Sequence, residues 1–98
     1  MILSGGQNIY ATDLEQALNA IPDVVESAVV AKPSEEWGET PWAFVVSRAD
    51  SERVEEDIRL DANKQLSPIQ AIAGVTFMDE LPRSDIGKIL KRQLRDTF

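Results

Sequence analysis

Lys88 is the residue best suited to chemistry, because a glycine precedes it and a helix is expected to begin nearby. It closes a segment, residues 82–88, that reads PRSDIGK. Gly87 frees the backbone beside the cation, and a mobile ammonium near the free amides of a helix start suits a phosphate or a carboxylate. The alternative that this segment leaves open is an ordinary surface lysine.

Two adjacent glycines near the start of the chain are a second candidate. Gly5 and Gly6 stand between Ser4 and Asn8. Glycine adopts backbone angles that other residues avoid, so the pair predicts a tight turn. A backbone without side chains could also approach a bound ligand closely, and the pattern alone leaves both interpretations open.

Clustered carboxylates form a third candidate, the segment EEWGE at residues 35–39. Neither an EF-hand pattern nor a histidine accompanies them, so we expect no metal site there. We interpret the segment as a solvated acidic loop in which Trp37 covers an edge of the sheet.

The composition excludes several classes of function. The chain has no cysteine and no histidine, which excludes disulfides, thiolate metal ligands and nucleophiles activated by histidine. The net charge of −7 argues against nucleic acid as a partner. The longest uninterrupted apolar run, Trp42 to Val46, is too short to cross a membrane. The lack of cysteine fits a cytoplasmic location.

Length and hydrophobic pattern predict a single domain, residues 1–98, of the α+β class. Strands are expected at the start of the chain and over residues 24–31, 42–47 and 75–78. The two longer strands are expected to form an antiparallel hairpin with a long connection over residues 33–40. The prediction is a small antiparallel or mixed sheet of about three strands plus a short N-terminal strand, packed against about three helices. A ferredoxin-like ligand-binding module fits this order of elements as well.

Three helices are expected from apolar residues at helical spacing. The first is expected to begin near Thr12, where Thr12 and Glu15 form a capping-box pattern, and to end at Pro22. The second is expected to be capped by Asp50 or Ser51. The residues predicted to be buried are Leu14, Ala17, Leu18 and Ile21 in the first helix, Val54, Ile58, Ala62 and Leu66 in the second, and Ile86, Leu90 and Leu94 in the third, where Lys91, Arg92 and Arg95 are predicted to be exposed.

Three segments together resemble the C-terminal domain of adenylate-forming (AMP-binding) enzymes, in particular of acyl- and aryl-CoA ligases. Residues 4–15 resemble the family's SGGxNIYPxEVE stretch, residues 29–46 its hairpin, and residues 79–92 (DELPRSDIGKILKR) its C-terminal signature. The three matches occur in order, at the family's usual separations, and span nearly the whole chain. The Asn-Ile-Tyr form is closer to the CoA ligases than to the peptide-synthetase adenylation domains.

The resemblance implies a two-step reaction in which this chain is a mobile lid. A carboxylate attacks ATP, giving an acyl-adenylate and pyrophosphate, and coenzyme A then captures the adenylate. ATP and coenzyme A are therefore implied as substrates of the full enzyme. Mg²⁺ would be bound by a large N-terminal domain, and no cofactor or metal is expected in this chain alone. The same resemblance implies fatty acid metabolism in the cytoplasm as the setting.

The resemblance also implies roles for particular residues. Lys88 resembles the catalytic lysine of the adenylation step, which is supported by a signature loop containing Pro82, Arg83 and Gly87. The residues implied for the coenzyme A channel in the thioester step are Ser4, Gly5, Gly6 and Asn8.

The sequence departs from the family at two places, and the family's hinge and phosphate loop are not in the chain. Ala11 replaces a proline, and residues 67–73 replace a Lys-x-Pro segment. We expect one piece of a larger ligase, inactive in isolation, whose partner is the large N-terminal domain in cis or in trans. The alternatives are a free-standing binding or regulatory module and the small subunit of a split ligase. The pocket that selects the acyl group is expected to lie in the large N-terminal domain.

Overall fold

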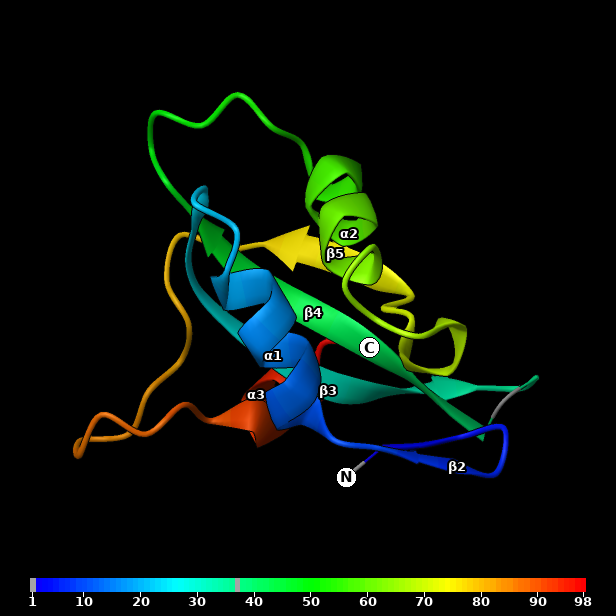
Figure 1. The fold of residues 1–98 in the computed structure, drawn as a ribbon. Coiled ribbons are helices and arrows are strands. Elements are labelled where there is room, and N and C mark those ends of the chain that lie inside the picture. The colour runs from blue at the N-terminus through cyan, green and yellow to red at the C-terminus, as the bar shows by residue number, and fades with distance from the viewer. Residues whose placement is uncertain (1, 37) are drawn as a thin grey trace.

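The computed structural model describes residues 2–36 and 38–98, which form an α+β domain, as predicted (Figure 1). The strands are β1 (Ile2–Ser4), β2 (Gln7–Ile9), β3 (Val24–Ser34), β4 (Gly38–Ser47) and β5 (Gly74–Phe77). The helices are α1 (Ala11–Asn19), α2 (Glu55–Asn63) and α3 (Lys91–Arg95), and a 3-10 turn spans Pro68–Gln70.

Strand β4 is the centre of the mixed five-stranded sheet. β3 pairs with it antiparallel along one edge, from Ser34 opposite Gly38 to Val24 opposite Ser47. On the other edge, β1 meets β4 at Gly38, and β5 runs parallel to residues 42–45. β2 pairs antiparallel with β1, so the two strands form a hairpin at the end of this sheet.

Both faces of the sheet are covered, which explains why β3 and β4 read as nearly continuous apolar runs. Along β4, Ala43 and Val45 point toward α1 and α2, whereas Trp42 and Phe44 point toward α3. The first buried cluster therefore includes Leu14, Leu18, Val29, Ala43, Val45, Ile58, Ala62 and Ile72. The second consists of Ala28, Val30, Phe44, Leu81 and Leu94.

The first helix starts one residue earlier than predicted and has no side-chain cap. The predicted capping box of Thr12 and Glu15 is wrong because the Glu15 carboxylate has other partners. It accepts a hydrogen bond from the backbone N–H of Val29 at 2.9 Å and pairs with the ammonium of Lys91 at 2.9 Å. Glu15 thus ties α1 to β3 and to α3.

The strands extend beyond the limits predicted for them. β3 and β4 continue through most of the polar residues 33–40, so the predicted long connection is wrong and the hairpin turn is short. Strand β2 was not predicted, because its three residues are too few to show an alternation of apolar and polar residues. The expected position of Trp37 over the sheet edge lies outside the described residues.

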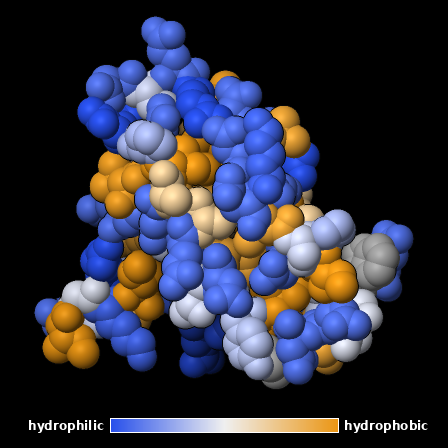
Figure 2. All heavy atoms as spheres, viewed as in Figure 1, coloured by the Kyte–Doolittle hydropathy of each residue, from blue (hydrophilic) through white to orange (hydrophobic). Residues whose placement is uncertain are grey.

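The later helices differ from prediction at their ends. Helix α2 begins at Glu55, and neither Asp50 nor Ser51 caps it; the backbone N–H of Val54 instead donates to the Asp57 carboxylate at 3.2 Å. The Val54 side chain is 59% exposed rather than buried. Ile86 is 89% exposed, because it lies at the tip of a loop before α3 instead of inside a helix. Figure 2 shows the hydrophilic outer surface that α1 and α2 present.

Ile72 shows how part of the segment 67–73, which departs from the pattern of the resembled family, is accommodated. Ile72 is fully buried, and the Asn63 side-chain amide bonds its backbone N–H at 2.8 Å and its carbonyl at 3.2 Å. Gly74 lies directly opposite Trp42 in the sheet. A Cβ atom at Gly74 would lie 2.2 Å from the indole ring of Trp42.

We expect Gly74→Ala to destabilise the domain by about 1–3 kcal/mol through overpacking. The Trp42 ring cannot yield easily, because its indole N–H donates to Thr76 Oγ1 at 2.9 Å and the Lys32 ammonium lies 4.3 Å from its ring centroid. Urea unfolding of Gly74→Ala, Trp42→Leu and the double variant measures the coupling. Additive losses in the double variant would show that the ring is not the obstacle.

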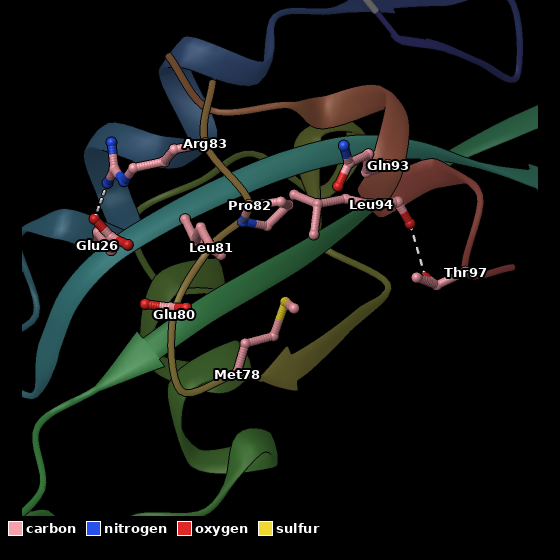
Figure 3. A pocket seen from close by; sticks show the side chains of 9 residues that line it. All are labelled: Glu26, Met78, Glu80, Leu81, Pro82, Arg83, Gln93, Leu94 and Thr97. Atoms are coloured by element: carbon pink, nitrogen blue, oxygen red, sulfur yellow. Dashed lines mark hydrogen bonds and ion pairs between the residues drawn. The ribbon is translucent and has the colours of Figure 1, made fainter. Parts of the chain in front are cut away.

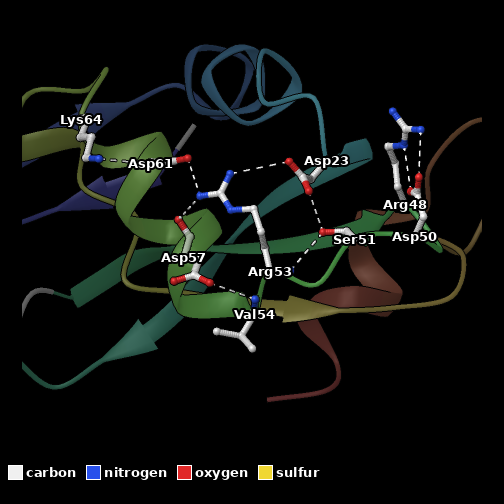
Figure 4. Close-up of polar contacts among 9 residues, drawn as sticks. All are labelled: Asp23, Arg48, Asp50, Ser51, Arg53, Val54, Asp57, Asp61 and Lys64. Atoms are coloured by element: carbon white, nitrogen blue, oxygen red, sulfur yellow. Dashed lines mark hydrogen bonds and ion pairs between the residues drawn. The ribbon is translucent and has the colours of Figure 1, made fainter.

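An arginine holds the irregular segment between β4 and α2 (Figure 4). Arg53 pairs with Asp23 at 3.7 Å, donates to the Asp57 carbonyl at 3.1 Å and forms a hydrogen-bonded ion pair with Asp61. Ser51 Oγ donates to the Asp23 carboxylate at 2.7 Å. The hydrogen bond from Arg53 holds the pKa of Asp61 below its ordinary value of 3.8.

Because the folded pKa of Asp61 is depressed, its contribution to stability is present above pH 3.8 and is lost as the pH falls through the folded value. We therefore expect Asp61→Asn to lower the urea midpoint at about pH 6, and the difference from wild type to be smaller at about pH 2.5. Asp50→Asn, which removes the partner of exposed Arg48, is the control and should change the midpoint little. A difference that is equal at both pH values would contradict this expectation.

Candidate functional site

Lys88 lies in a short looped-back segment, residues 82–90, which we call the Lys88 loop. The Ser84 N–H donates to the Lys88 carbonyl at 2.8 Å, and the Leu90 N–H donates to the Pro82 carbonyl at 2.8 Å. Gly87 turns the chain with a φ of 83°, and a Cβ atom there would meet nothing within 4 Å. Glycine is therefore required by the backbone angle and not by lack of space.

The Lys88 side chain is exposed, and its ammonium has no hydrogen-bond or ion-pair partner among the residues that the structure describes. The Lys88 N–H is already bonded to Ser84 Oγ at 3.2 Å. Helix α3 begins only at Lys91 and has five residues. The ammonium is therefore available to a ligand, but the expected group of free helix-start amides does not surround it.

Arg83 connects the Lys88 loop to strand β3. One guanidinium nitrogen donates to the Gly87 carbonyl at 3.0 Å, and the other forms an ion pair with the Glu26 carboxylate on β3. Figure 3 shows Arg83 reaching across to Glu26. An open groove of about 690 Å³ lies beside this pair. The groove is lined by Glu26, Met78, Glu80, Leu81, Pro82, Arg83, Gln93, Leu94 and Thr97.

The two N-terminal glycines form the turn between β1 and β2, which we call the glycine hairpin (residues 2–9). Ser4 pairs with Gln7, and Gly5 and Gly6 have φ angles of 55° and 82°. Two consecutive positive φ angles are those of a type I′ hairpin turn. Asn8 pairs with Leu3, and its side chain is exposed.

An open groove of about 490 Å³ lies against one side of the glycine hairpin. Its walls come from the hairpin, from β4 and from the segment around the 3-10 turn; they are Ser4, Gly5, Gln7, Thr40, Pro68, Ile69 and Ala71. Ile69 is 57% exposed, and Figure 2 shows apolar atoms on this side of the molecule. The glycine backbone is thus accessible from solvent at a partly apolar surface.

The structure does not bring the two candidate sites together. Figure 1 places the turn of the glycine hairpin and the tip of the Lys88 loop on opposite sides of the domain. One ligand held in one place could not meet both. The domain therefore presents two separate candidate sites, each built on a loop.

Two ion pairs next to these sites were not found by sequence reasoning. Glu26 and Arg83 are 57 positions apart, so no local pattern connects them. Lys91 was predicted to be exposed, but it is half-buried and paired with Glu15. The positions beyond it behave as predicted, since Arg92 and Arg95 are exposed.

Within residues 2–36 and 38–98, no group of three or more acidic, histidine or cysteine side chains is arranged to hold a metal ion. In the same part of the chain, no helix has the length and apolar character needed to cross a bilayer.

Residues 13–88 match the family model described as "AMP-binding enzyme C-terminal domain". The chain is 43% identical over 96 residues to trans-cinnamate:CoA ligase from Petunia hybrida, covering 98% of this chain and 17% of that protein. It is 37% identical over 95 residues to 2-succinylbenzoate–CoA ligase from Lactococcus lactis, covering 97% of this chain and 20% of that protein. It matches the crystal structure of apo MatB from Rhodopseudomonas palustris with a TM-score of 0.92 and 36% identity, covering 97% of this chain and 19% of that one. The chain thus spans no more than 20% of the length of these relatives.

Proposed function

Since the chain belongs to the family of AMP-binding enzyme C-terminal domains, we propose that it is the lid domain of an ATP-dependent acyl- or aryl-CoA ligase. In the first half-reaction, a carboxylate oxygen of the acid attacks the α-phosphorus of ATP and pyrophosphate leaves. In the second, the thiol of coenzyme A attacks the carbonyl carbon of the acyl-adenylate, AMP leaves and the thiol proton is lost. The large domain, in the same chain or in another, would hold the nucleotide, its Mg²⁺ and the acid.

The observation that carries this proposal is the state of Lys88. Its ammonium is exposed and unpartnered among the described residues, while the backbone on either side is fixed by the Lys88 loop. A carboxylate and a triphosphate repel each other, and negative charge shifts between their oxygens during the attack. A fixed cation placed between them lowers this repulsion. Lys88 is the group of this chain that we propose for that role.

The glycine hairpin is proposed to act in the second half-reaction. Its type I′ turn requires backbone angles that suit glycine, and its surface is free of bulky side chains at Gly5 and Gly6. A thin backbone of this kind can line a channel for the flexible arm of coenzyme A. The adjacent groove between the hairpin and Ile69 supplies partly apolar walls for such an arm.

The separation of the two loops supports a lid that works in two orientations. Because the Lys88 loop and the glycine hairpin lie on opposite sides of the domain, one active site could use both only if the domain rotates between the steps. Rotation of a rigid domain about a hinge is a common way to complete one site at a time. We propose that the lid turns after the adenylate forms.

The pure 98-residue chain is expected to fold and to release no pyrophosphate from ATP with any of a panel of carboxylic acids. The physical reason is that two exposed loops on opposite sides of the domain supply neither a nucleotide pocket nor an acid pocket. The matched sample is a fusion in which the chain replaces the C-terminal domain of a related ligase, where pyrophosphate release should return. Pyrophosphate release by the pure chain would overturn the proposal, and so would a folded fusion that releases no pyrophosphate.

A further inference from the structure

We propose that Glu26 is a positioning residue for the adenylation step, acting through Arg83 on the peptide group that carries Lys88. This inference rests on the role proposed for Lys88. Nothing in the local sequence around Glu26 indicates it, since the residue lies on β3, far from the signature loop in the chain.

A β-bulge places Glu26 on the correct face of the sheet. Val24 pairs with Ser47 and Glu26 pairs with Val46, so Val25 is an extra residue in β3. Before the bulge, Val24 belongs to the cluster under α1 and α2. After it, the alternation of the strand places Glu26 on the side of Ala28, which belongs to the cluster under α3. In a regular strand, Val24, Glu26 and Ala28 would all lie on the same face of the sheet. The extra residue lets Val24 and Glu26 lie on opposite faces.

The guanidinium group of Arg83 connects Glu26 to the Lys88 loop. Its Nη2 atom pairs with Glu26, and its Nη1 atom donates to the Gly87 carbonyl at 3.0 Å. The guanidinium is planar and rigid, so fixing one nitrogen fixes the direction in which the other donates. Glu26 therefore orients the hydrogen bond that reaches Gly87.

The bond to Gly87 matters because it completes the hold on one peptide group. The Gly87 carbonyl and the Lys88 N–H belong to the same planar unit. The carbonyl accepts from Arg83, and the N–H donates to Ser84 Oγ at 3.2 Å. With both ends bonded, the unit resists rotation, and this restrains the Cα atom of Lys88, from which the long side chain reaches out.

The ion pair between Glu26 and Arg83 is partly exposed, which suits a role in positioning the Lys88 loop more than a role in stabilising the fold. The side chain of Glu26 is 27% exposed and that of Arg83 is 41% exposed. Ion pairs as exposed as this contribute little to the stability of a fold. Their loss is expected to leave the domain folded while releasing the Lys88 loop.

The first test uses the 98-residue chain itself and measures backbone motion by ¹⁵N relaxation. In wild type, the order parameter of the Lys88 amide should be near 0.85, and in Glu26→Ala it should fall below about 0.6. Glu56→Ala is the matched control, because it removes the ion-pair partner of Arg59 on α2 and should leave the Lys88 amide unchanged. A Lys88 amide that is already mobile in wild type, or equally rigid in Glu26→Ala, would overturn the inference.

The second test measures each half-reaction in the ligase that carries this chain as its lid. Glu26→Ala should lower the rate of adenylation about tenfold, leave capture of a supplied acyl-adenylate by coenzyme A unchanged, and shift the melting temperature only slightly. Arg83→Lys should behave similarly, because one ammonium cannot reproduce the fork.

A reversed pair separates positioning from stability. Glu26→Arg combined with Arg83→Glu restores an ion pair, but a carboxylate at position 83 cannot donate to the Gly87 carbonyl. Adenylation should therefore stay low while the melting temperature stays near the wild-type value, and full recovery of adenylation would overturn the inference. If Lys88→Ala abolishes adenylation but Glu26→Ala does not, the positioning role alone fails. If Lys88→Ala has no effect, the proposed function of Lys88 fails, and the positioning role fails with it.

Discussion

Replacing Lys88 by alanine in the full ligase should slow formation of the acyl-adenylate by about 10²–10³-fold. The change removes an exposed ammonium that has no hydrogen-bond or ion-pair partner among the described residues. The backbone contacts of the Lys88 loop come from Ser84, Arg83 and the peptide groups, and they survive the substitution. The expected loss is therefore catalytic and not a loss of folding.

The measurement is pyrophosphate release from ATP and acid, alongside capture of a supplied acyl-adenylate by coenzyme A. Capture should continue at nearly the wild-type rate, because the proposal assigns that step to the glycine hairpin. Arg92→Ala and Arg95→Ala are matched controls, since both residues are exposed cations on α3 and near Lys88 in sequence. A fall in adenylation of less than about tenfold, or an equal fall in both controls, would reduce Lys88 to a surface lysine.

Local patterns predicted the central elements and failed where distant partners decide. The strands around Val30 and Phe44 were predicted because their burial on both faces gives a continuous apolar run. The capping role of Glu15 was wrong because its carboxylate bonds Val29 and Lys91, which lie on other elements. Both partners are far from Glu15 in the sequence, so the residues near position 15 could not indicate them.

Helix ends were the least predictable part of the fold. Ile86 stands at helical spacing before Leu90 and Leu94, and a helix there would bury it. The Lys88 loop uses the intervening residues for its own hydrogen bonds, so Ile86 projects into solvent and α3 is left with five residues. Spacing alone cannot separate a helical stripe from an apolar residue at a loop tip.

In the candidate sites, too, features that depend on local sequence were predicted, and a contact between distant segments was not. Gly5, Gly6 and Gly87 were predicted from their type, and each has the positive φ angle that glycine allows. The ion pair of Glu26 with Arg83 was not predicted, because it depends on a bulge in β3 and on a crossing of two segments that only the folded chain brings together.

Placing asparagine at Gly6 should slow the thioester step by about 10²-fold while adenylation stays near wild type. Asparagine tolerates positive φ angles better than other side chains do, so the turn between β1 and β2 should persist. A Cβ atom at Gly6 meets nothing within 4 Å in this domain. A selective loss of the thioester step would therefore point to an obstruction outside the domain, and on our proposal that is the arm of coenzyme A.

The experiment compares Gly6→Asn with Gln7→Ala, an exposed neighbour in the same hairpin whose truncation adds no bulk. Each variant is assayed for adenylation and for capture of a supplied acyl-adenylate, and melting temperatures are recorded to confirm that the hairpin still folds. A selective loss of capture in Gly6→Asn, absent in Gln7→Ala, is the expected result. Equal loss of both half-reactions in Gly6→Asn would mean that the glycine shapes the domain and does not face a ligand. Unimpaired capture would show that space at Gly6 is not needed, which would remove the hairpin from the proposed channel and leave its glycines to the turn alone.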